Sequence, residues 1–527
     1  MGKYLLKRLL HGVFSIVVVV AIVMILVYTA IDKEFIFRQD PLIQKKNSNE
    51  KIAYKYQCWE DYGYLDYVMY TDWLKEITDA GEIDETTRAA AASFARTAEK
   101  DTEIVKEYAA KFKEVYEAKG YTVVRLDADT QSATSTQLKK GGQQRYFAYK
   151  NTPLFVRIWN YFKGVVRIDN IHYATGDVGK RGLTFTLYDP VYGGEKFSPA
   201  IMGNGTKYKY LLYFDNSFPY IHQNLITINL GLSYSINKGV DVWTTMVQPQ
   251  GAIVMEDTYY PTGHVEQSSN NLHTARYAEG SLATGGLFNS TRYTDDYTVV
   301  TATKTGFSKM SYSFIIGIVA SLIAYLVGIP LGILMSRNQD KLLDKIGTLY
   351  IVFIIAVPSL AYIFMFRAIG MQFGWPTTFS TDPAAGIKIY FLPIISGALP
   401  AIGGLMKWTR RYMIDQKNSD YVKFARSGGL SEGEIFRGHI LKNAMIIIVH
   451  SIPGSILGSL VGGIITERVY TVPGTGGMLV NAITAYDNAA IVGLAMFYAM
   501  LSVLSLILGD ILMAMIDPRI SFSTKGR

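Results

Sequence analysis

The sequence predicts an α-helical membrane protein in which six transmembrane helices carry a large α+β domain between the first and the second helix. Apolar residues concentrate in residues 9–31 and 310–516, which contain runs long enough, at about 20 residues, to cross a bilayer. Residues 32–305 have the mixed composition of a folded soluble domain. A hydrophobic content of 49% and a positive mean hydropathy of +0.14 exclude an ordinary soluble protein of 527 residues.

Three regions follow from this distribution: an N-terminal transmembrane helix in residues 1–31, an extracytoplasmic domain in 32–305 and a five-helix core in 306–527. The basic start and the apolar run after it also fit a cleaved signal peptide. However, the run is longer than the ~7–15 apolar residues of a signal-peptide core. Asp32 also follows it where a cleavage site would carry small residues. We therefore expect an uncleaved first helix.

The inserted domain is predicted to be helical in its first half and to consist of strands in its second half. Asp84 is a good N-cap for a helix that Gly120 would end, and aromatic and β-branched runs between Gly, Asn and Pro indicate strands. Its many tyrosines are either strand faces or a surface for a binding protein or peptide. Cys58 is the only cysteine, so an intrachain disulfide is excluded. The expected helices cover 61–80 and 84–119, and the expected strands include 184–188, 208–214 and 298–303.

Five further transmembrane helices are expected after the insertion. Pro and Gly are tolerated inside them because neighbouring helices satisfy the freed backbone groups. The segments that this arrangement places in the cytosol hold 17 Lys and Arg against 7 Asp and Glu. Positive charge is retained on the cytoplasmic side, so both termini and the loop 407–443 are expected there. The expected helices cover 310–335, 346–369 with Pro358, 389–406 with Pro393 and Pro400, 444–466, and 489–516.

The loop 407–443 carries the strongest functional signal. Residues 420–426 have helical composition, and Gly428 and Gly429 break the helix. Ser431 and Glu434 have the spacing of a capping box that starts a second helix. A membrane protein that holds a helix–glycine–helix segment at its cytosolic face is expected to present it to a soluble partner.

The fifth expected helix carries small residues every four positions along one face, which lets another backbone approach closely. One interpretation is packing, within this chain or against a partner. The other is a translocation path, in which the missing side-chain bulk leaves room for varied cargo. Both hold if the path lies at a subunit interface. The face consists of Gly454, Ser455, Gly458, Ser459 and Gly462.

The remaining sequence argues against several other classes of protein. Asp510 is the only acidic residue well inside an expected helix, whereas gradient-driven transporters need buried ionisable groups along their path. The glycines of 176–181 lack the spacing of a phosphate-binding loop, and we find no metal-ligand or catalytic constellation. A membrane sensor would need a cytosolic output domain, and no expected cytosolic segment is longer than 407–443. We expect a chain that is not catalytic by itself.

The loop resembles the coupling loop of ABC-importer permeases, whose pattern is E-A-A-x-x-x-G, nine residues, then I-x-L-P. In that register Gly429 takes the glycine position and Ala425 the second alanine. Lys423, Phe424 and Lys442 replace the glutamate, the first alanine and the proline, and these departures are similar to the oligopeptide/dipeptide branch. Other stretches resemble the first of the two homologous pore subunits of that branch (the OppB/AmiC type), namely 4–10, 153–164, 328–332, 466–479 and 517–519. The long stretch 164–305 departs from most members.

The resemblance implies the type I ABC importer permease fold and a pore-forming subunit that moves oligopeptides with energy from other chains. The implied partners are a homologous second permease, two cytosolic ATPase subunits, an extracellular peptide-binding lipoprotein and the lipid bilayer of the cell membrane. No cofactor is expected on this chain, because ATP and magnesium would bind the ATPases. Another solute such as nickel or a sugar, and the membrane sensor, stay as alternatives.

The resemblance also implies that the coupling loop sits in a cleft of an ATPase subunit. Tyr421 and Leu430 are expected as apolar anchors, and Arg426 and Glu432 as polar contacts at the rim. Gly429 would allow the sharp turn between the two helices. The long insertion is expected to receive the binding protein and to funnel peptide to the pore. The full set of expected coupling residues is Asp420, Tyr421, Ala425, Arg426, Gly428, Gly429, Leu430, Ser431 and Glu432.

Overall fold

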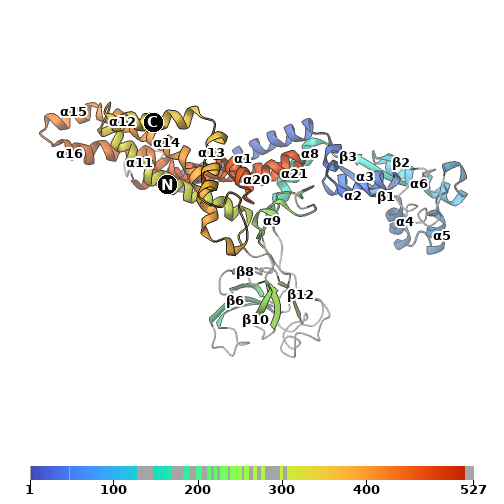
Figure 1. Ribbon diagram of the computed structural model, residues 1–527. Helices are drawn as coiled ribbons and strands as arrows, with labels where there is room; N and C mark the ends of the chain where they lie inside the picture. The colour runs from blue at the N-terminus through green and yellow to red at the C-terminus, as the bar shows by residue number, and fades with distance from the viewer. Residues whose placement is uncertain are drawn as a thin grey trace.

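A computed structural model of the chain gives an elongated helical bundle with folded units attached to it (Figure 1). Helices α15 (Asp420–Ser427) and α16 (Glu432–Ile435) lie at one end of the bundle, which we call the hairpin end. The unit of residues 33–151 extends from the opposite end, which we call the domain end. Residues 176–181, whose glycines lack the spacing of a phosphate-binding loop, lie outside the described residues. The structure describes residues 2–46, 48–95, 97–126, 146–168, 182–188, 197–204, 210–214, 219–221, 226–235, 238–251, 255–259, 265–269, 275–278, 297–300 and 306–516.

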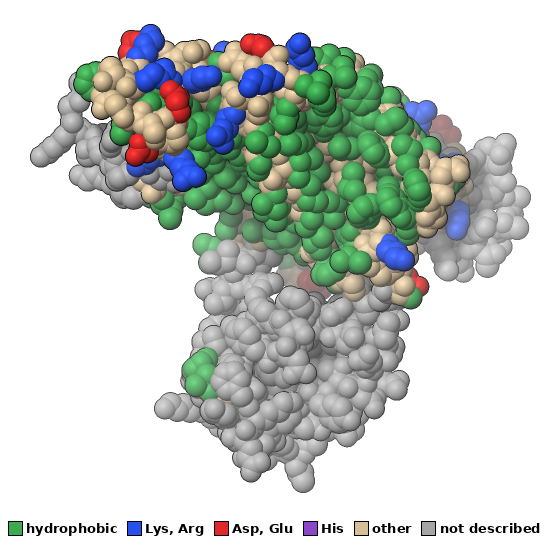
Figure 2. All heavy atoms as spheres, turned by 60° about the vertical axis from the view of Figure 1, so that its left-hand side comes forward, with side chains coloured by type: hydrophobic (Ala, Val, Ile, Leu, Met, Phe, Trp, Pro, Cys, Tyr) green, Lys and Arg blue, Asp and Glu red, His purple; other side chains and the backbone are tan. Residues whose placement is uncertain are grey.

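Five helical stretches in the described part of the chain are long and apolar enough to cross a membrane, and one bent helix pair meets the same criteria. Figure 2 shows apolar side chains over a broad side of the bundle, with Lys and Arg side chains gathered toward one end. The chain is therefore a multi-pass membrane protein. The stretches are Tyr4–Ala30, Lys309–Arg337, Ile387–Lys417, Glu432–Gly458 and Asn488–Met515.

The expected single helix over 346–369 is wrong, because two helices meet there at an angle of 107°. Pro358 has no N–H to continue the first helix and restricts the residue before it, so Val357 adopts an extended backbone. The expected helix over 444–466 is divided into α17, α18 and α19, with breaks at Ser451 and Gly463, and the remaining expected helices are present with shifted ends. The helices of the bundle are α1 (Gly2–Ala30), α11 (Lys309–Arg337), α12 (Leu342–Ala356), α13 (Ser359–Gln372), α14 (Phe391–Lys417), α17 (Lys442–His450), α18 (Ile452–Gly462), α19 (Ile464–Tyr470), α20 (Thr475–Thr484) and α21 (Asn488–Ile516), with short turns η5 (Pro383–Ala385) and η6 (Ile387–Tyr390).

Helices α11 and α14 pack closely because glycines replace side chains at their contact. A Cβ atom added at Gly328 would lie 2.9 Å from the Cβ atom of Leu405, and one added at Gly332 would lie 2.7 Å from that of Thr409. The two glycines are four residues apart and share one face of α11. Close backbone approach of this kind is how helices associate in lipid, where no hydrophobic force drives them together.

Two ion pairs tie helices together within the bundle. The Arg8 guanidinium of α1 lies 3.0 Å from the Asp510 carboxylate of α21, which also accepts a hydrogen bond from the Tyr4 hydroxyl. Asp510 is thus a helix-packing residue. Arg410 of α14 donates two hydrogen bonds to Asp344 of α12, at 2.6 and 2.7 Å, which is the strong bidentate geometry.

The unit at the domain end is a three-stranded antiparallel sheet of order β1-β3-β2 covered by helices. The expected helix over 61–80 is wrong in its first half, because β3 pairs with residues 65–69 and draws them into the sheet. Tyr70, Phe112 and Phe147 are fully buried in its aromatic core. Its elements are η1 (Lys33–Phe37), α2 (Pro41–Gln44), α3 (Ser48–Asp61), β1 (Leu65–Met69), α4 (Tyr70–Asp79), α5 (Glu85–Ala91), η2 (Ala98–Lys100), α6 (Glu103–Ala118), β2 (Thr122–Arg125) and β3 (Tyr146–Asn151).

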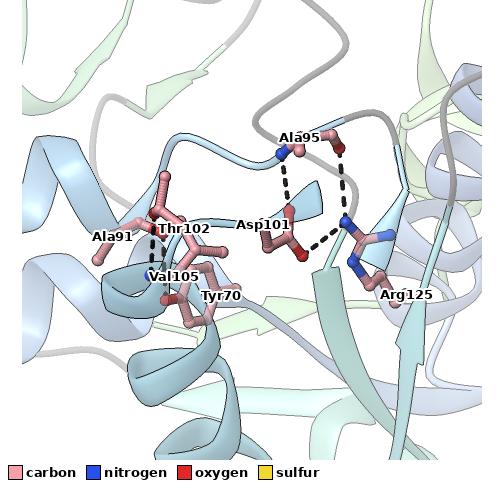
Figure 3. A network of polar contacts seen from close by, with 7 residues as sticks. All are labelled: Tyr70, Ala91, Ala95, Asp101, Thr102, Val105 and Arg125. Carbon is pink, nitrogen blue, oxygen red and sulfur yellow. Dashed lines mark hydrogen bonds and ion pairs between the residues drawn. The ribbon is translucent and has the colours of Figure 1, made fainter. Parts of the chain in front are cut away.

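A buried carboxylate interrupts the helix that the sequence predicts over 84–119 (Figure 3). Asp84 caps α5 as expected, but α5 ends at Ala91. Asp101 then accepts the backbone N–H of Ala95 at 2.7 Å and a guanidinium hydrogen bond from Arg125 at 2.7 Å. These contacts hold the connection between α5 and α6 against β2.

Strands make up most of the described remainder of the insertion. Strands β5, β7 and β13 confirm the described parts of the strands expected at 184–188, 208–214 and 298–303. They belong to the antiparallel sheets β5-β6-β7-β8 and β12-β13, beside the pairs β10-β11 and β4-β9. The elements are α8 (Leu154–Val165), β4 (Val166–Ile168), β5 (Gly182–Tyr188), β6 (Phe197–Asn204), β7 (Tyr210–Phe214), β8 (Pro219–Ile221), β9 (Ile226–Ile228), α9 (Val242–Val247), β10 (Met255–Tyr259), β11 (Val265–Ser269), β12 (Ala275–Ala278) and β13 (Tyr297–Val300).

A second buried carboxylate joins the insertion to the bundle. Asp487, just before α21, is completely buried and accepts the backbone N–H groups of Tyr234 and Ser235 at 2.9 and 3.0 Å. It also accepts the Ser233 hydroxyl at 2.7 Å and caps α21 through the N–H of Ala490 at 3.0 Å. The segment 233–235 of the insertion is therefore fixed to the first turn of α21.

We predict that Asp487→Ala destabilises the junction between the insertion and the bundle by about 3 kcal/mol, because it leaves several buried donors without an acceptor. Thermal unfolding of the purified protein in detergent measures this as a drop of several degrees in Tm. Asp66→Ala is the matched control, because that carboxylate is exposed on β1. Equal Tm values for the two variants would contradict the assigned role of Asp487.

Candidate functional site

The helix–glycine–helix segment predicted from the sequence is present at the hairpin end. Helix α15 (Asp420–Ser427) is followed by Gly428 and Gly429, and α16 (Glu432–Ile435) begins after Ser431. Gly429 has φ +87°, in the left-handed region that favours glycine. We call residues 420–435 the hairpin.

Polar contacts within the hairpin fix its turn. The Ser431 hydroxyl accepts the Glu434 N–H, and the Glu434 carboxylate accepts the Ser431 N–H, so the predicted capping box is present. Arg426 donates two hydrogen bonds to Glu432, at 2.6 and 3.1 Å, and this raises the pKa of the Arg426 guanidinium. The Lys423 ammonium, 2.9 Å from Asp420, lowers the pKa of that carboxyl group.

The inner side of the hairpin packs on the bundle. Val422 and Ile435 are completely buried, and Ala425 is buried beside them, in one cluster with Met413 of α14. We call this buried cluster the hairpin seat. It continues into η7 (Phe436–Leu441), a π-helical segment that leads into α17.

The loop 407–443 is shorter in the structure than the sequence predicts. Helix α14 continues to Lys417, and the next apolar stretch already begins at Glu432 instead of residue 444. The basic residues at both ends of the predicted loop therefore lie in helical turns at the end of the bundle. Only residues 418–431 connect the two stretches.

The outward side of the hairpin differs from the expected one. Phe424 is 81% exposed and Leu430 is 40% exposed, so these two side chains form its apolar surface. Tyr421 is half-buried and its hydroxyl donates to Gln416 at 2.5 Å, so its ring is less exposed than that of Phe424, and its role as an anchor stays a prediction. Arg426 and Glu432 pair with each other. A phenylalanine at an alanine position of the family pattern is the signal in the sequence that indicates Phe424.

A cavity of about 440 Å³ lies between the helices of the bundle. Along α14 it runs from Pro393 to Trp408, roughly 22 Å at the rise of an α-helix. Its walls are apolar, with small residues and scattered hydroxyl groups. The lining residues include Ser313, Gly317, Ala320, Ser321, Tyr325, Ser359, Tyr362, Ser396, Gly397, Ala401, Gly404, Ser451, Ser455, Thr466 and Glu467.

Glu467 is a buried acidic residue of this cavity that sequence reasoning missed. It is 2% exposed, accepts the Ser313 hydroxyl at 2.6 Å and accepts the Gly477 N–H at 2.9 Å. A Cβ atom at Gly474 would lie 2.3 Å from its carboxylate, so the glycine-rich loop after α19 closes around the carboxylate. The expected helix over 444–466 ends one residue before Glu467. The signal in the sequence is the stretch 466–479, which resembles the family of pore subunits.

The small-residue face of the fifth expected helix lies on α18. A Cβ atom added at Gly454 or Gly458 would meet nothing within 4 Å among the described residues, so both positions have open space beside them. Ser455 lines the cavity and shares a hydrogen bond with the Tyr325 hydroxyl. Ser459 and Gly462 belong to the helical backbone of α18.

Comparisons with known proteins agree with this architecture. The family described as "Binding-protein-dependent transport system inner membrane component" matches residues 328–522. The oligopeptide transport system permease protein AmiC of Streptococcus pneumoniae is 32% identical over 531 residues, which cover 100% of both chains. The oligopeptide transport system permease protein AppB of Bacillus subtilis is 28% identical over 225 residues, 41% of this chain and 71% of AppB.

Among solved structures, a chain of the MetNI methionine ABC transporter in inward-facing conformations matches 40% of this chain and 94% of its own length, with a TM-score of 0.33 and 11% identity. The match to AmiC includes the insertion, so this unusual stretch is shared with a relative. With full-length similarity above 30% identity, the chain belongs to the oligopeptide transport permeases within the family of binding-protein-dependent transport system inner membrane components.

Proposed function

We propose that this chain is a pore-forming subunit of an ATP-driven importer that carries oligopeptides across the cell membrane. The observation that carries the proposal is full-length similarity to AmiC combined with a rigid, outward-facing hairpin. A homologous second permease completes the pore, two ATPase subunits supply the energy, and a peptide-binding lipoprotein delivers cargo to the insertion. ATP and magnesium bind the ATPases, and this chain binds no cofactor.

The hairpin end faces the cytosol in this proposal. Seventeen Lys and Arg against seven Asp and Glu in the segments expected at that side support the orientation. Phe424 and Leu430 enter a cleft of one ATPase, with the Arg426–Glu432 pair at its rim. Because the other side of the hairpin is buried against α14 and η7, closure of the ATPases shifts these helices together.

The cavity along α14 is the part of the path that this chain contributes. Peptides share main-chain groups whatever their sequence, so a tolerant path needs hydroxyl groups and room in place of specific side-chain pockets. Ser313, Ser359 and Ser396 supply hydroxyls, and Gly397 and Gly404 leave room. The open side of Gly454 and Gly458 suits close approach of the second permease.

Replacing Gly429 by Leu should abolish peptide uptake and association with the ATPases while membrane insertion stays normal. A residue with a side chain pays about 1–3 kcal/mol for this left-handed backbone, so the turn changes shape although the surrounding space is open. Uptake of a labelled peptide and co-purification of the ATPases measure the effect.

A pair of smaller substitutions separates backbone strain from bulk. Gly433 also has open space at its Cβ position but lies in the regular backbone of α16. Gly433→Ala should leave uptake unchanged, whereas Gly429→Ala should lower it. Full uptake by both Gly429 variants would count against the coupling role of the hairpin.

Filling the cavity should block transport without loosening the complex. Gly404 lines the cavity and a Cβ atom there meets nothing within 4 Å, so the side chain of a substituted residue begins in open space. We expect Gly404→Leu to lower peptide uptake by about tenfold or more, equivalent to ~1.4 kcal/mol, while the ATPases still co-purify. Gly404→Ala adds one methyl group and should retain most uptake. Equal uptake by the two variants would place the path elsewhere.

A further inference from the structure

Helix α8 carries an aromatic face that no other described part of the chain covers. Phe155 is 74% exposed and Trp159 is 70% exposed, and Lys163 is exposed one turn further. Residues four apart lie on one face of a helix, so the three side chains form a stripe. The helix contains no acidic residue.

The opposite face of α8 is fixed to the bundle. Ile158, Phe162 and Val165 pack into one apolar cluster with Val20 and Met24 of α1. The same cluster includes the first turns of α21. This packing sets which face of α8 points outward.

The contacts of α8 also fix its height along the bundle. The Arg157 guanidinium lies 3.9 Å from the ring centre of Tyr28 and 3.7 Å from that of Tyr64. Tyr28 is in the last turn of α1, where its membrane-spanning stretch ends, and Figure 1 shows α8 beside that end. Ile22 and Leu26, just before Tyr28, are exposed apolar residues of a membrane-spanning helix. The stripe therefore lies at the level where the membrane-spanning stretch of α1 ends.

We propose that α8 is an interfacial helix that anchors the insertion in the bilayer leaflet at the domain end. Phe155 and Trp159 enter the boundary between acyl chains and headgroups, a depth that aromatic side chains prefer. Lys163 extends from the end of the stripe to the phospholipid phosphates while its aliphatic stem stays in the apolar layer. The anchor holds the unit of residues 33–151 at a fixed position relative to the membrane surface, beside the pore.

Nitroxide labels on introduced cysteines test this placement in the full chain, reconstituted in phosphatidylcholine and phosphatidylglycerol vesicles alone and with its partner subunits. Cys58 is buried, so the parent chain gives the labelling background. Trp159→Cys is the test position, and Phe155→Cys serves if that variant does not fold. Ile22→Cys on the exposed side of α1 is the lipid reference, and Glu114→Cys, exposed on α6, is the water reference.

At residue 159 we expect oxygen, which partitions into lipid, to relax the label more than a water-soluble nickel chelate does. The nickel effect should be several-fold smaller than at residue 114. The logarithm of the ratio of the oxygen effect to the nickel effect should have the same sign as at residue 22. A nickel effect equal to that at residue 114 would put the stripe in water. Shielding from both reagents, with or without the partner subunits, would mean that protein covers it. Either result overturns the proposal.

Discussion

The buried apolar contact beneath the hairpin is the interaction on which the rest of the account depends. Val422 and Ile435 are completely removed from water against Met413, and burial of each such side chain contributes about 2 kcal/mol. The φ +87° turn at Gly429 and the capping box at Ser431 hold the two short helices in one shape above this contact. A short loop without such a contact would bend under load, whereas in the proposed mechanism this segment would pass displacement to α14 and η7.

The same helices that support the hairpin also line the cavity. Helix α14 joins the hairpin seat at Met413 to the cavity wall at Trp408 and Pro393, which is the physical connection that the proposed mechanism requires. At the domain end Glu467 joins α11 to the glycine-rich loop after α19, and Asp487 joins α21 to the insertion. These buried carboxylates are fully engaged by donors in the fold, which suits a structural role better than proton transfer along the path.

The features that the sequence predicted well have local causes. The capping box, the glycine turn and the long apolar helices depend on residues close together in the chain, so the hairpin and most of the bundle were predictable. The break at Pro358 was not, because a proline inside an apolar run either kinks a helix slightly or ends it, and neighbouring helices decide which.

Other errors came from contacts between distant residues. β1 sits in a stretch of helical composition because β3 pairs with it from about 80 residues away, and sheet pairing outweighs local preference. Glu467 is buried because Ser313 and Gly477 satisfy its oxygens, which no local pattern indicates. The half-buried position of Tyr421 depends in the same way on its side-chain hydrogen bond to Gln416.

We propose that the energy for transport comes from ATPases that act on the hairpin, and that this chain moves no substrate uphill by itself. Reconstitution in vesicles tests it most directly, with accumulation of a labelled oligopeptide measured for this chain alone, for the complete complex and for a complex whose ATPases cannot hydrolyse ATP. We expect accumulation against a gradient only in the complete complex supplied with ATP. Accumulation by this chain alone, driven by an ion gradient, would contradict it.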